Sequence, residues 1–239
     1  FSALQRDAEG APKGPVLTTP TLASLSSAGT HSLCYDFTVS LQPAPGQQWC
    51  TVQAQVDQKT FLSYDCGVDR VKTLSALGEK VNTTVTWREQ NTALRDMGQM
   101  LRQQLADIKA ENPRARDFLV LEGRMSCQLK SSGCTSGSWE FGFNGQMRLR
   151  FDSDNRRWTE VHPGSNWMKE KWENDREVTE FLHRSSKGDC RAWLEKFLEQ
   201  WKAEQWKAEL TPAGDWQEGG GCTYFWSGIS CGVLAGFIP

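Results

Sequence analysis

The sequence predicts an α+β fold in which one antiparallel sheet of about eight strands carries two long helices on one face. The main observation is a repeated order: residues 31–113 and 114–207 each contain short alternating segments followed by one long stretch with helical spacing. A half with about three or four strands cannot cover a sheet face with one helix of its own. Joining the halves edge to edge gives a single platform, residues 31–207, with both helices on the same side.

Composition and charge limit the compartment and the class of partner. The 239 residues carry a formal net charge of −2 and no basic run of five or more, so nucleic acid is not an expected partner. Eight cysteines occur without a C-x-x-C spacing, which disfavours zinc sites and is typical of a secreted, oxidised protein. The sequon Asn82-Thr83-Thr84, which makes Asn82 a candidate glycosylation site, agrees with that compartment.

Both ends of the chain differ in composition from the platform. Residues 1–30 are rich in small and polar residues without an apolar core, so we expect a disordered or mis-joined segment rather than a signal peptide. Residues 208–239 comprise a polar spacer and an uncharged apolar tail, which is typical of a stalk and a glycosylphosphatidylinositol attachment signal. Ala213 and Gly214 are the candidate attachment residues. A poor membrane span and an uninformative tail are the alternatives.

The first half begins with strands. Residues 33–42 alternate apolar and polar side chains, which indicates a half-buried strand, and further strands are expected at 52–57 and near 61–65. Cys50 and Cys66 lie near the outer ends of these two later strands. A disulfide there would tie the hairpin and contribute about 3 kcal/mol in the chain-entropy model.

A long helix is predicted over residues 78–110, and Asn112-Pro113 ends it. Its apolar residues recur three or four positions apart as a narrow stripe, which is the pattern of a helix with one buried face. The stripe consists of Leu94, Met97, Leu101, Leu105 and Ile108.

The second half repeats this plan. Asn144-Gly145 predicts a type I′ hairpin turn, and a long helix is expected over about residues 165–209. Poor helix formers at 185–189 predict a kink in that helix. Strands are expected at 118–127, 139–143, 147–151 and 156–161.

The sequence contains no recognisable catalytic or metal-binding set. His31, His162 and His183 are far apart in the chain, and no nucleophile-elbow, zinc-protease, phosphate-loop or dinucleotide motif occurs. Acidic pairs fall on helix surfaces, where solvated side chains are the ordinary case. We therefore expect no enzymatic activity, no cofactor and no metal.

Several separated motifs resemble one known family. Met125-Ser126-Cys127 on an expected strand and Gly188-Asp189-Cys190 on the last helix are similar to the disulfide-bearing segments of MHC class I-like alpha-1/alpha-2 platforms. Five longer motifs, within about residues 31–201, are similar to the ULBP/retinoic acid early transcript branch of that family. They are HSLCYDFTVS, QQWCTVQAQVDQKTFLSYDCG, GSWEFGFNGQ, FDSDNRRWTEVHPG and KEKWENDREVT.

This resemblance implies a platform without an immunoglobulin-like third domain, beta-2-microglobulin or bound peptide. It implies a cell-surface ligand, often glycosylphosphatidylinositol-anchored, for the natural-killer group 2, member D receptor on NK and T cells. That receptor is a homodimer that straddles both helices. A groove carrying a lipid or peptide, and a secreted or decoy form, are the alternatives. Bulky residues between the helices, such as Phe181 and Trp193, favour a closed groove.

The resemblance also assigns disulfides. Cys127–Cys190 would pin the second helix to the sheet and close a loop of about 60 residues, worth ~4 kcal/mol by loop entropy. Cys50–Cys66 is a pair characteristic of the branch. Cys34 and Cys134 remain, and they either bridge each other or stay as two buried thiols.

The expected receptor-binding residues are polar side chains that lie off the apolar stripes of the two helices. On a platform they would form a nearly flat surface of the size of a standard protein interface. For any single member, an ordinary solvated helix position is the alternative. The set comprises Arg88, Arg95, Gln99, Arg102, Gln103, Arg176, Thr179, Glu180, His183 and Arg184.

Overall fold

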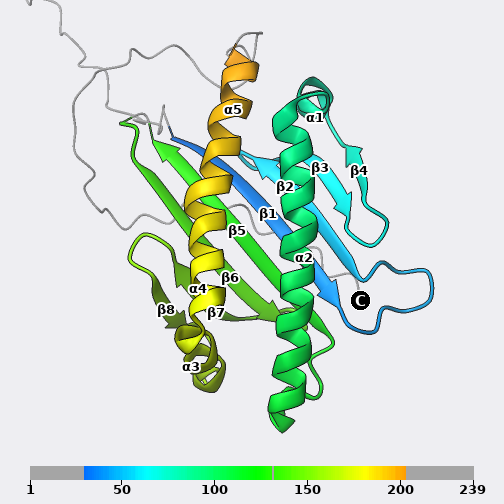
Figure 1. The fold of residues 1–239 in the computed structure, drawn as a ribbon, viewed down its shortest axis with the longest axis vertical. Helices are drawn as coiled ribbons and strands as arrows, with labels where there is room; N and C mark the ends of the chain where they lie inside the picture. Colours follow the sequence, from blue (N-terminus) through cyan, green and yellow to red (C-terminus); the bar gives the residue numbers. More distant parts are fainter. Residues whose placement is uncertain (1–29, 131, 203–239) are drawn as a thin grey trace, which may run out of the picture.

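The computed structural model describes residues 30–130 and 132–202, and it has the predicted α+β architecture (Figure 1). One eight-stranded antiparallel sheet has the strand order β4-β3-β2-β1-β5-β6-β7-β8. The expectations for residues 1–29 and for the tail, including Ala213 and Gly214, fall outside the described residues. The strands are β1 Thr30–Ser40, β2 Cys50–Val56, β3 Lys59–Asp65, β4 Arg70–Thr73, β5 Val120–Lys130, β6 Thr135–Phe143, β7 Gln146–Asp152 and β8 Arg157–Glu160.

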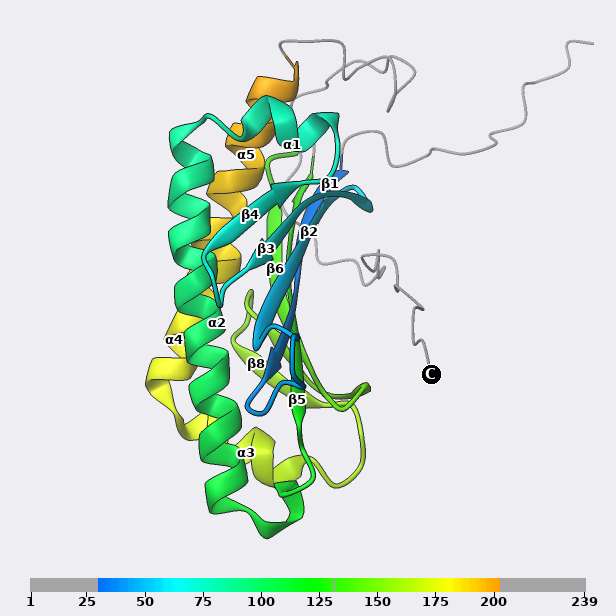
Figure 2. The ribbon, with the colours of Figure 1, turned by 90° about the vertical axis from the view of Figure 1, so that its right-hand side faces the viewer.

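The two halves of the platform join edge to edge through β1 and β5, as expected. Their antiparallel register places Phe37 opposite Gly123 and Val39 opposite Leu121. The alternation of β1 holds in three dimensions, because Tyr35, Phe37 and Val39 are buried while Thr38 is exposed. Figure 2 shows the helices together on one side of the sheet, over this buried face.

The β6–β7 hairpin turns at Asn144-Gly145, as predicted. Both residues have positive φ, 50° and 80°, which a type I′ turn requires. The Asn144 side chain also accepts hydrogen bonds from the backbone N–H groups of Leu119 and Val120, at 2.9 and 3.0 Å. The turn therefore also fixes the segment that enters β5.

The first long helix is divided in two, whereas the sequence predicted one continuous helix from residue 78. Helix α1, Ala76–Val81, is followed by α2, Val85–Glu111. Thr84 causes the break because its backbone is extended and its hydroxyl accepts a hydrogen bond from Trp87 N–H at 3.1 Å, which caps α2. Helix α2 ends before the short 3-10 turn η1, Pro113–Ala115, as predicted from the proline.

The second helical segment is divided at two points. Helices α3, Asn166–Asn174, and α4, Arg176–His183, meet at Asp175, whose side chain caps α4 by accepting from Val178 N–H at 3.1 Å. The apolar spacing of this segment did not predict this first break. The second break is where the kink was predicted. It is a π-helix, η2, Arg184–Asp189, and α5, Cys190–Lys202, follows it.

Two disulfides link described residues. Cys127 on β5 and Cys190 on α5 are bonded with their Cα atoms 6.1 Å apart, and Cys50 and Cys66 are bonded with theirs 5.4 Å apart. The first bond connects a helix to the sheet, and the second joins the start of β2 to the end of β3. Both pairs are the ones that the resemblance implied.

The suggested bond between Cys34 and Cys134 does not fit the strand register. Cys34 lies opposite Ser126 of β5, whereas the backbone of Cys134 bonds to Lys130, four residues further along the same strand. Four residues of strand span about 13 Å, and disulfides join Cα atoms only about 4–7 Å apart. Both sulfurs are nevertheless in disulfides, so the alternative of buried thiols is also wrong.

Candidate functional site

The candidate site is the face formed by the outward sides of α2 and of the segment α3–α5, and side chains join the two across the seam between them. The Trp172 indole N–H donates to Gln104 Oε1 at 2.8 Å, and both side chains are buried. Near the end of α2, Lys171 Nζ lies 2.7 Å from Glu111. These contacts tie the two helical segments directly to each other.

Aromatic side chains fill the space below the seam. Trp193 packs edge-on against Tyr35 of β1 with ring centroids 5.6 Å apart, and Phe197 packs against Phe61 of β3 at 5.7 Å. Trp193 is only 5% exposed, which agrees with the closed groove expected from its bulk. A packed seam makes the two helices one continuous surface.

Trp139 of β6 supports both helices at the centre of the platform. Its indole N–H donates to the carbonyl of Leu182 and to the hydroxyl of Ser185, each at 3.2 Å. On the other side, Leu101 of α2 packs above Gly123, where an added Cβ would lie 3.3 Å from Leu101 Cδ1 and 3.6 Å from Trp139 Cζ3. The buried Trp139 indole therefore fixes the distance of α4 from the sheet through its hydrogen bonds. The same indole lies beside the Leu101 side chain of α2.

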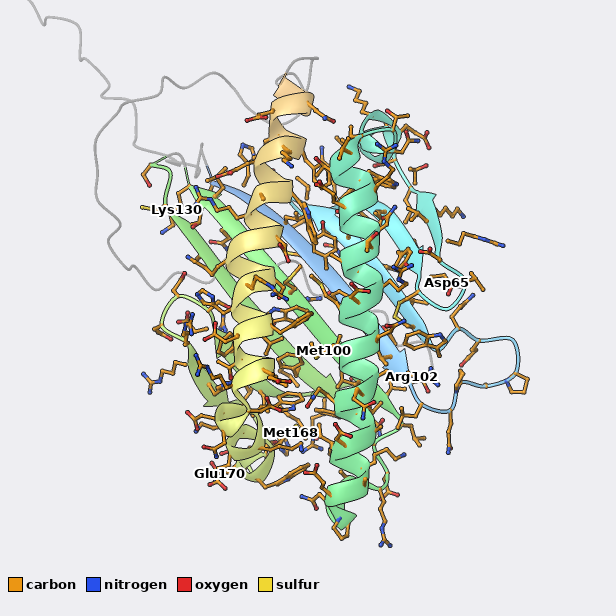
Figure 3. All side chains as sticks on the ribbon, viewed as in Figure 1. Asp65, Met100, Arg102, Lys130, Met168 and Glu170 are labelled. Atoms are coloured by element: carbon orange, nitrogen blue, oxygen red, sulfur yellow. A yellow bond between two sulfur atoms is a disulfide. The ribbon has the colours of Figure 1, made fainter. Side chains whose placement is uncertain are left out.

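On α2, the predicted residues divide between the top of the helix and its outer flank, which we define as the side turned away from α3–α5. Arg95 lies 3.5 Å from Asp69, beyond the end of β3, and the Arg102 guanidinium stacks on Trp49 at 4.7 Å from the ring centroid. Figure 3 places Arg102 on this flank and Met100 on the opposite, inner side. Arg88, Gln99 and Gln103 are exposed.

The outer flank contains a hollow of about 270 Å³. Its walls come from α2 and from the segment after β1, and it lies beside the Arg102–Trp49 stack. This hollow is separate from the seam, so it is no remnant of a groove between the helices. The lining residues are Leu41, Gln99, Arg102, Gln103 and Ala106.

On the second segment, the five predicted residues lie together on α4 and at the start of η2. Arg176, Glu180 and Arg184 are exposed, whereas Thr179 and His183 are half-buried. The Thr179 hydroxyl donates to the Trp172 carbonyl at 3.1 Å, so it bridges the break between α3 and α4.

Glu180 pairs with Arg156 from the β7–β8 turn. That hydrogen bond is the main reason why the pKa of the Glu180 carboxyl lies below its ordinary value. Nearly half of each side chain is exposed to solvent, so the pair orients Glu180 without adding much stability.

Two apolar residues on the helical face were missed as site candidates. Met100 and Phe181 are half-buried and pack against the core beside the seam. Met100 lies one turn before Gln104, which bonds to α3 through Trp172, so Met100 is on the inner side of α2. No sequence signal predicts this, because a 3.6-residue period shows which face of a helix is buried but not which flank meets the neighbouring helix.

The π-helix η2 sits directly on the sheet. The hydroxyls of Ser186 and Ser153 are 2.6 Å apart in a buried hydrogen bond, and Lys187 bonds to Asp154 and to the Thr135 carbonyl. Gly137 of β6 makes room for this approach, since a Cβ there would lie 3.0 Å from the Ser186 carbonyl oxygen. The contacts of η2 with the sheet therefore fix the position of α4 and of its exposed residues.

The opposite face of the sheet carries a row of alternating charges. Asp36, Arg124, Glu140 and Arg150 lie opposite one another on β1, β5, β6 and β7. Asp36 and Arg124 form an ion pair, and Arg150 Nε lies 3.8 Å from Glu140. Opposite charges facing each other across strands stabilise a sheet face that contacts water.

The sequon lies at the break between α1 and α2. Asn82 is half-buried, and its side-chain amide donates to Glu79 at 3.2 Å. Within residues 30–130 and 132–202, no group of His, Cys, Asp and Glu side chains is arranged to hold a metal ion. None of the helices in the same part of the chain combines the length and apolar character needed to cross a membrane.

Comparison with known proteins agrees with this architecture. Residues 29–205 match the family of class I histocompatibility antigens, domains alpha 1 and 2. Human UL-16 binding protein 5 is 51% identical over 189 residues, which is 77% of this chain and 57% of that protein. Human UL16-binding protein 2 is 51% identical over 77% of each chain. Human retinoic acid early transcript 1E is 39% identical over 73% of this chain and 66% of that protein.

The match therefore spans little more than half of one of these relatives and about three quarters of another. It nevertheless covers almost all of the platform, in which the sheet order, the two helical segments and the two disulfides occur. The chain belongs to the ULBP/retinoic acid early transcript family of MHC class I-like proteins.

Proposed function

We propose that this protein is a cell-surface ligand for the activating natural-killer group 2, member D receptor and that it presents no peptide. The observation that carries the proposal is the packed seam, which turns α2 and α3–α5 into one face that a single receptor dimer can cover. Family membership supports a ligand role, and the names of two relatives describe those proteins as binding another protein, UL16.

A carrier of lipid or peptide would need a space between the helices. The Trp172–Gln104 hydrogen bond and the Trp193–Tyr35 contact occupy that position, and the hollow of about 270 Å³ lies on the outer flank instead. The packing therefore supports a protein whose helices contact the receptor directly, without a bound lipid or peptide between them. Recovery of a stoichiometric lipid or peptide from the purified protein would contradict this.

We also propose that the platform needs no beta-2-microglobulin. The charge row from Asp36 to Arg150 satisfies polar groups within the sheet itself. Its exposed members, such as Arg150, already have an interaction partner from a neighbouring strand. A partner chain on this face would have to remove water from these paired charges at a free-energy cost.

For display, we propose a glycosylphosphatidylinositol anchor at Ala213 or Gly214, with a secreted form as the alternative. The spacer and apolar tail of the sequence support an anchor. Expression of the full chain on mammalian cells tests it. Release of surface protein by a phosphatidylinositol-specific phospholipase supports the anchor, whereas protein found only in the medium supports secretion.

Surface plasmon resonance of the full chain against the receptor ectodomain tests the ligand role. Arg176→Ala, Glu180→Ala and His183→Ala change α4, and Arg150→Ala changes the opposite face as a matched control. We expect at least one α4 variant to weaken binding about tenfold and the control to bind like the parent, because few interface residues carry most of the affinity. A parent that does not bind would refute the proposal.

A further inference from the structure

We infer that Met100 and Phe181 form the apolar centre of the docking face and that they bind one large apolar or aromatic side chain of the partner. This inference rests on the proposed function and adds the chemistry of the contact. Both residues are half-buried, and both pack against the hydrophobic core while part of each side chain stays exposed. Neither was among the polar residues expected from the sequence.

The two residues lie on the sides of α2 and α4 that are turned toward each other. Met100 is on the inner side of α2, as Figure 3 shows. Leu182 is buried against the sheet, and an α-helix turns about 100° per residue, so the residues on either side of Leu182 point to opposite sides of α4. Because the right-handed helix α4 runs from α3 toward α5, as Figure 1 shows, Phe181 falls on the side that faces α2. Their chain neighbours Leu101 and Leu182 both lie beside the Trp139 indole, which puts Met100 and Phe181 at the same level of the platform.

The surroundings have the anatomy of an interface centre. Arg184 lies over the Phe181 ring, with its guanidinium carbon 5.8 Å from the centroid, and exposed polar residues of both helices surround the pair. An apolar centre within a polar rim is the usual arrangement at protein interfaces. Methionine adapts its shape to an incoming side chain, and its sulfur makes favourable contacts with aromatic rings. The pair therefore suits an aromatic or branched aliphatic side chain rather than a charged one.

The chain offers closely matched controls away from this face. Met147 is 38% exposed at the start of β7. Phe118 is half-buried like Phe181 and also lies under an arginine, with the Arg148 guanidinium carbon 4.9 Å from its ring centroid. The four alanine variants thus compare the same residue types at two places.

The experiment measures the affinity of the full chain and of these four variants for the receptor ectodomain by surface plasmon resonance. We expect Met100→Ala and Phe181→Ala each to weaken binding about tenfold or more, and Met147→Ala and Phe118→Ala to change it less than about twofold. Phe181→Leu should retain most of the affinity because it keeps an apolar side chain. Circular dichroism melting confirms that each variant is folded.

Two other outcomes would overturn the inference, and they have different meanings. If the parent binds and the Met100 and Phe181 variants behave like their controls, the apolar centre is wrong while the ligand role stands. If the parent itself does not bind, the ligand role fails and the inference fails with it.

Discussion

Gly98 of α2 lies directly above the sulfur of Cys50. A Cβ added to Gly98 would lie 2.6 Å from Cys50 Sγ, closer than real Cβ contacts, and 3.0 Å from Cys66 Sγ, which is also tight. The Cys50–Cys66 disulfide is therefore part of the floor on which α2 rests, although it makes no covalent bond to the helix. The other disulfide, Cys127–Cys190, fixes the second helical segment covalently. Each half of the platform thus uses a disulfide to set the position of its helix.

The close contact at Gly98 predicts that alanine, which usually stabilises a helix, lowers the stability of the protein at this position. Gly98→Ala should destabilise the protein by about 1–3 kcal/mol through overpacking against the disulfide. Gly188→Ala in η2 is the control, because only Arg184 Cγ, at 3.9 Å, is near the added methyl group. Alanine in an open helical position usually stabilises by about 0.5–1 kcal/mol. Thermal unfolding should therefore show opposite shifts, and equal shifts would contradict the close contact.

The hydrogen bond between Trp172 and Gln104 predicts a cost for losing the acceptor. Gln104→Leu leaves the buried indole N–H without a partner, which should destabilise the protein by about 1–3 kcal/mol. Gln103→Leu changes the adjacent, exposed residue and should have little effect. Urea unfolding of both variants measures the difference, and similar midpoints would show that the hydrogen bond contributes nothing.

The π-helix predicts that the Cys127–Cys190 disulfide depends on the number of residues between Arg184 and Asp189 more than on the identity of their side chains. Deleting Gly188 should convert η2 to an α-helix and turn α5 by about 100° relative to the support below α4. Cys190 would then point away from Cys127. Peptide mapping without reduction should no longer recover the Cys127–Cys190 link, whereas Gly188→Ala should keep it. Recovery of the link in both variants would contradict the prediction.

The buried carboxyl of Glu122 predicts that the stability of the folded protein depends on pH. Burial raises the pKa of its carboxyl above the ordinary value of 4.5, and one carboxyl oxygen has no hydrogen-bond partner within the described residues. A folded pKa above the unfolded one favours the folded state at low pH, and this advantage is lost as the pH rises through the folded pKa. Glu122→Gln should therefore unfold at a higher temperature than the parent at pH 7.5.

The same substitution should give a much smaller difference at pH 4, where the parent carboxyl is largely protonated. Glu140→Gln is the control, because Glu140 is near Arg150 and loses an ion pair on substitution. If Glu122→Gln gave the same shift at both pH values, charge at this position would not be the cause.

The architecture could be predicted from the sequence because its signals are local and repeated. Alternation in β1, the Asn144-Gly145 turn and the apolar stripe of α2 each specify one element, and the strand–helix order repeats. The short edge strand β4 escaped prediction because it has only four residues, and Val71 is the one apolar side chain among them. The breaks at Thr84 and Asp175 escaped because capping by one side chain does not alter the overall helical period.

The candidate site was predicted less well than the fold. Sequence period places Arg95 and Arg102 off the buried stripe, but only the contacts with Asp69 and Trp49 reveal that both lie on the outer flank. The sequence left two alternatives open for Cys34 and Cys134, a bond to each other or two buried thiols, because a count of cysteines does not contain the strand register that separates them. Met100 and Phe181 read as core residues until the neighbouring helix is in place.

The most direct test of the proposed ligand role is the stoichiometry of the complex with the receptor ectodomain, measured by sedimentation velocity. Because α2 and α3–α5 form one face, we expect a single copy of this protein to occupy each receptor homodimer. Phe181→Ala should reduce the amount of complex at the same concentrations, and Phe118→Ala should not. A complex with two copies per homodimer, or no complex with the parent protein, would contradict the proposal that both helices together form one docking surface.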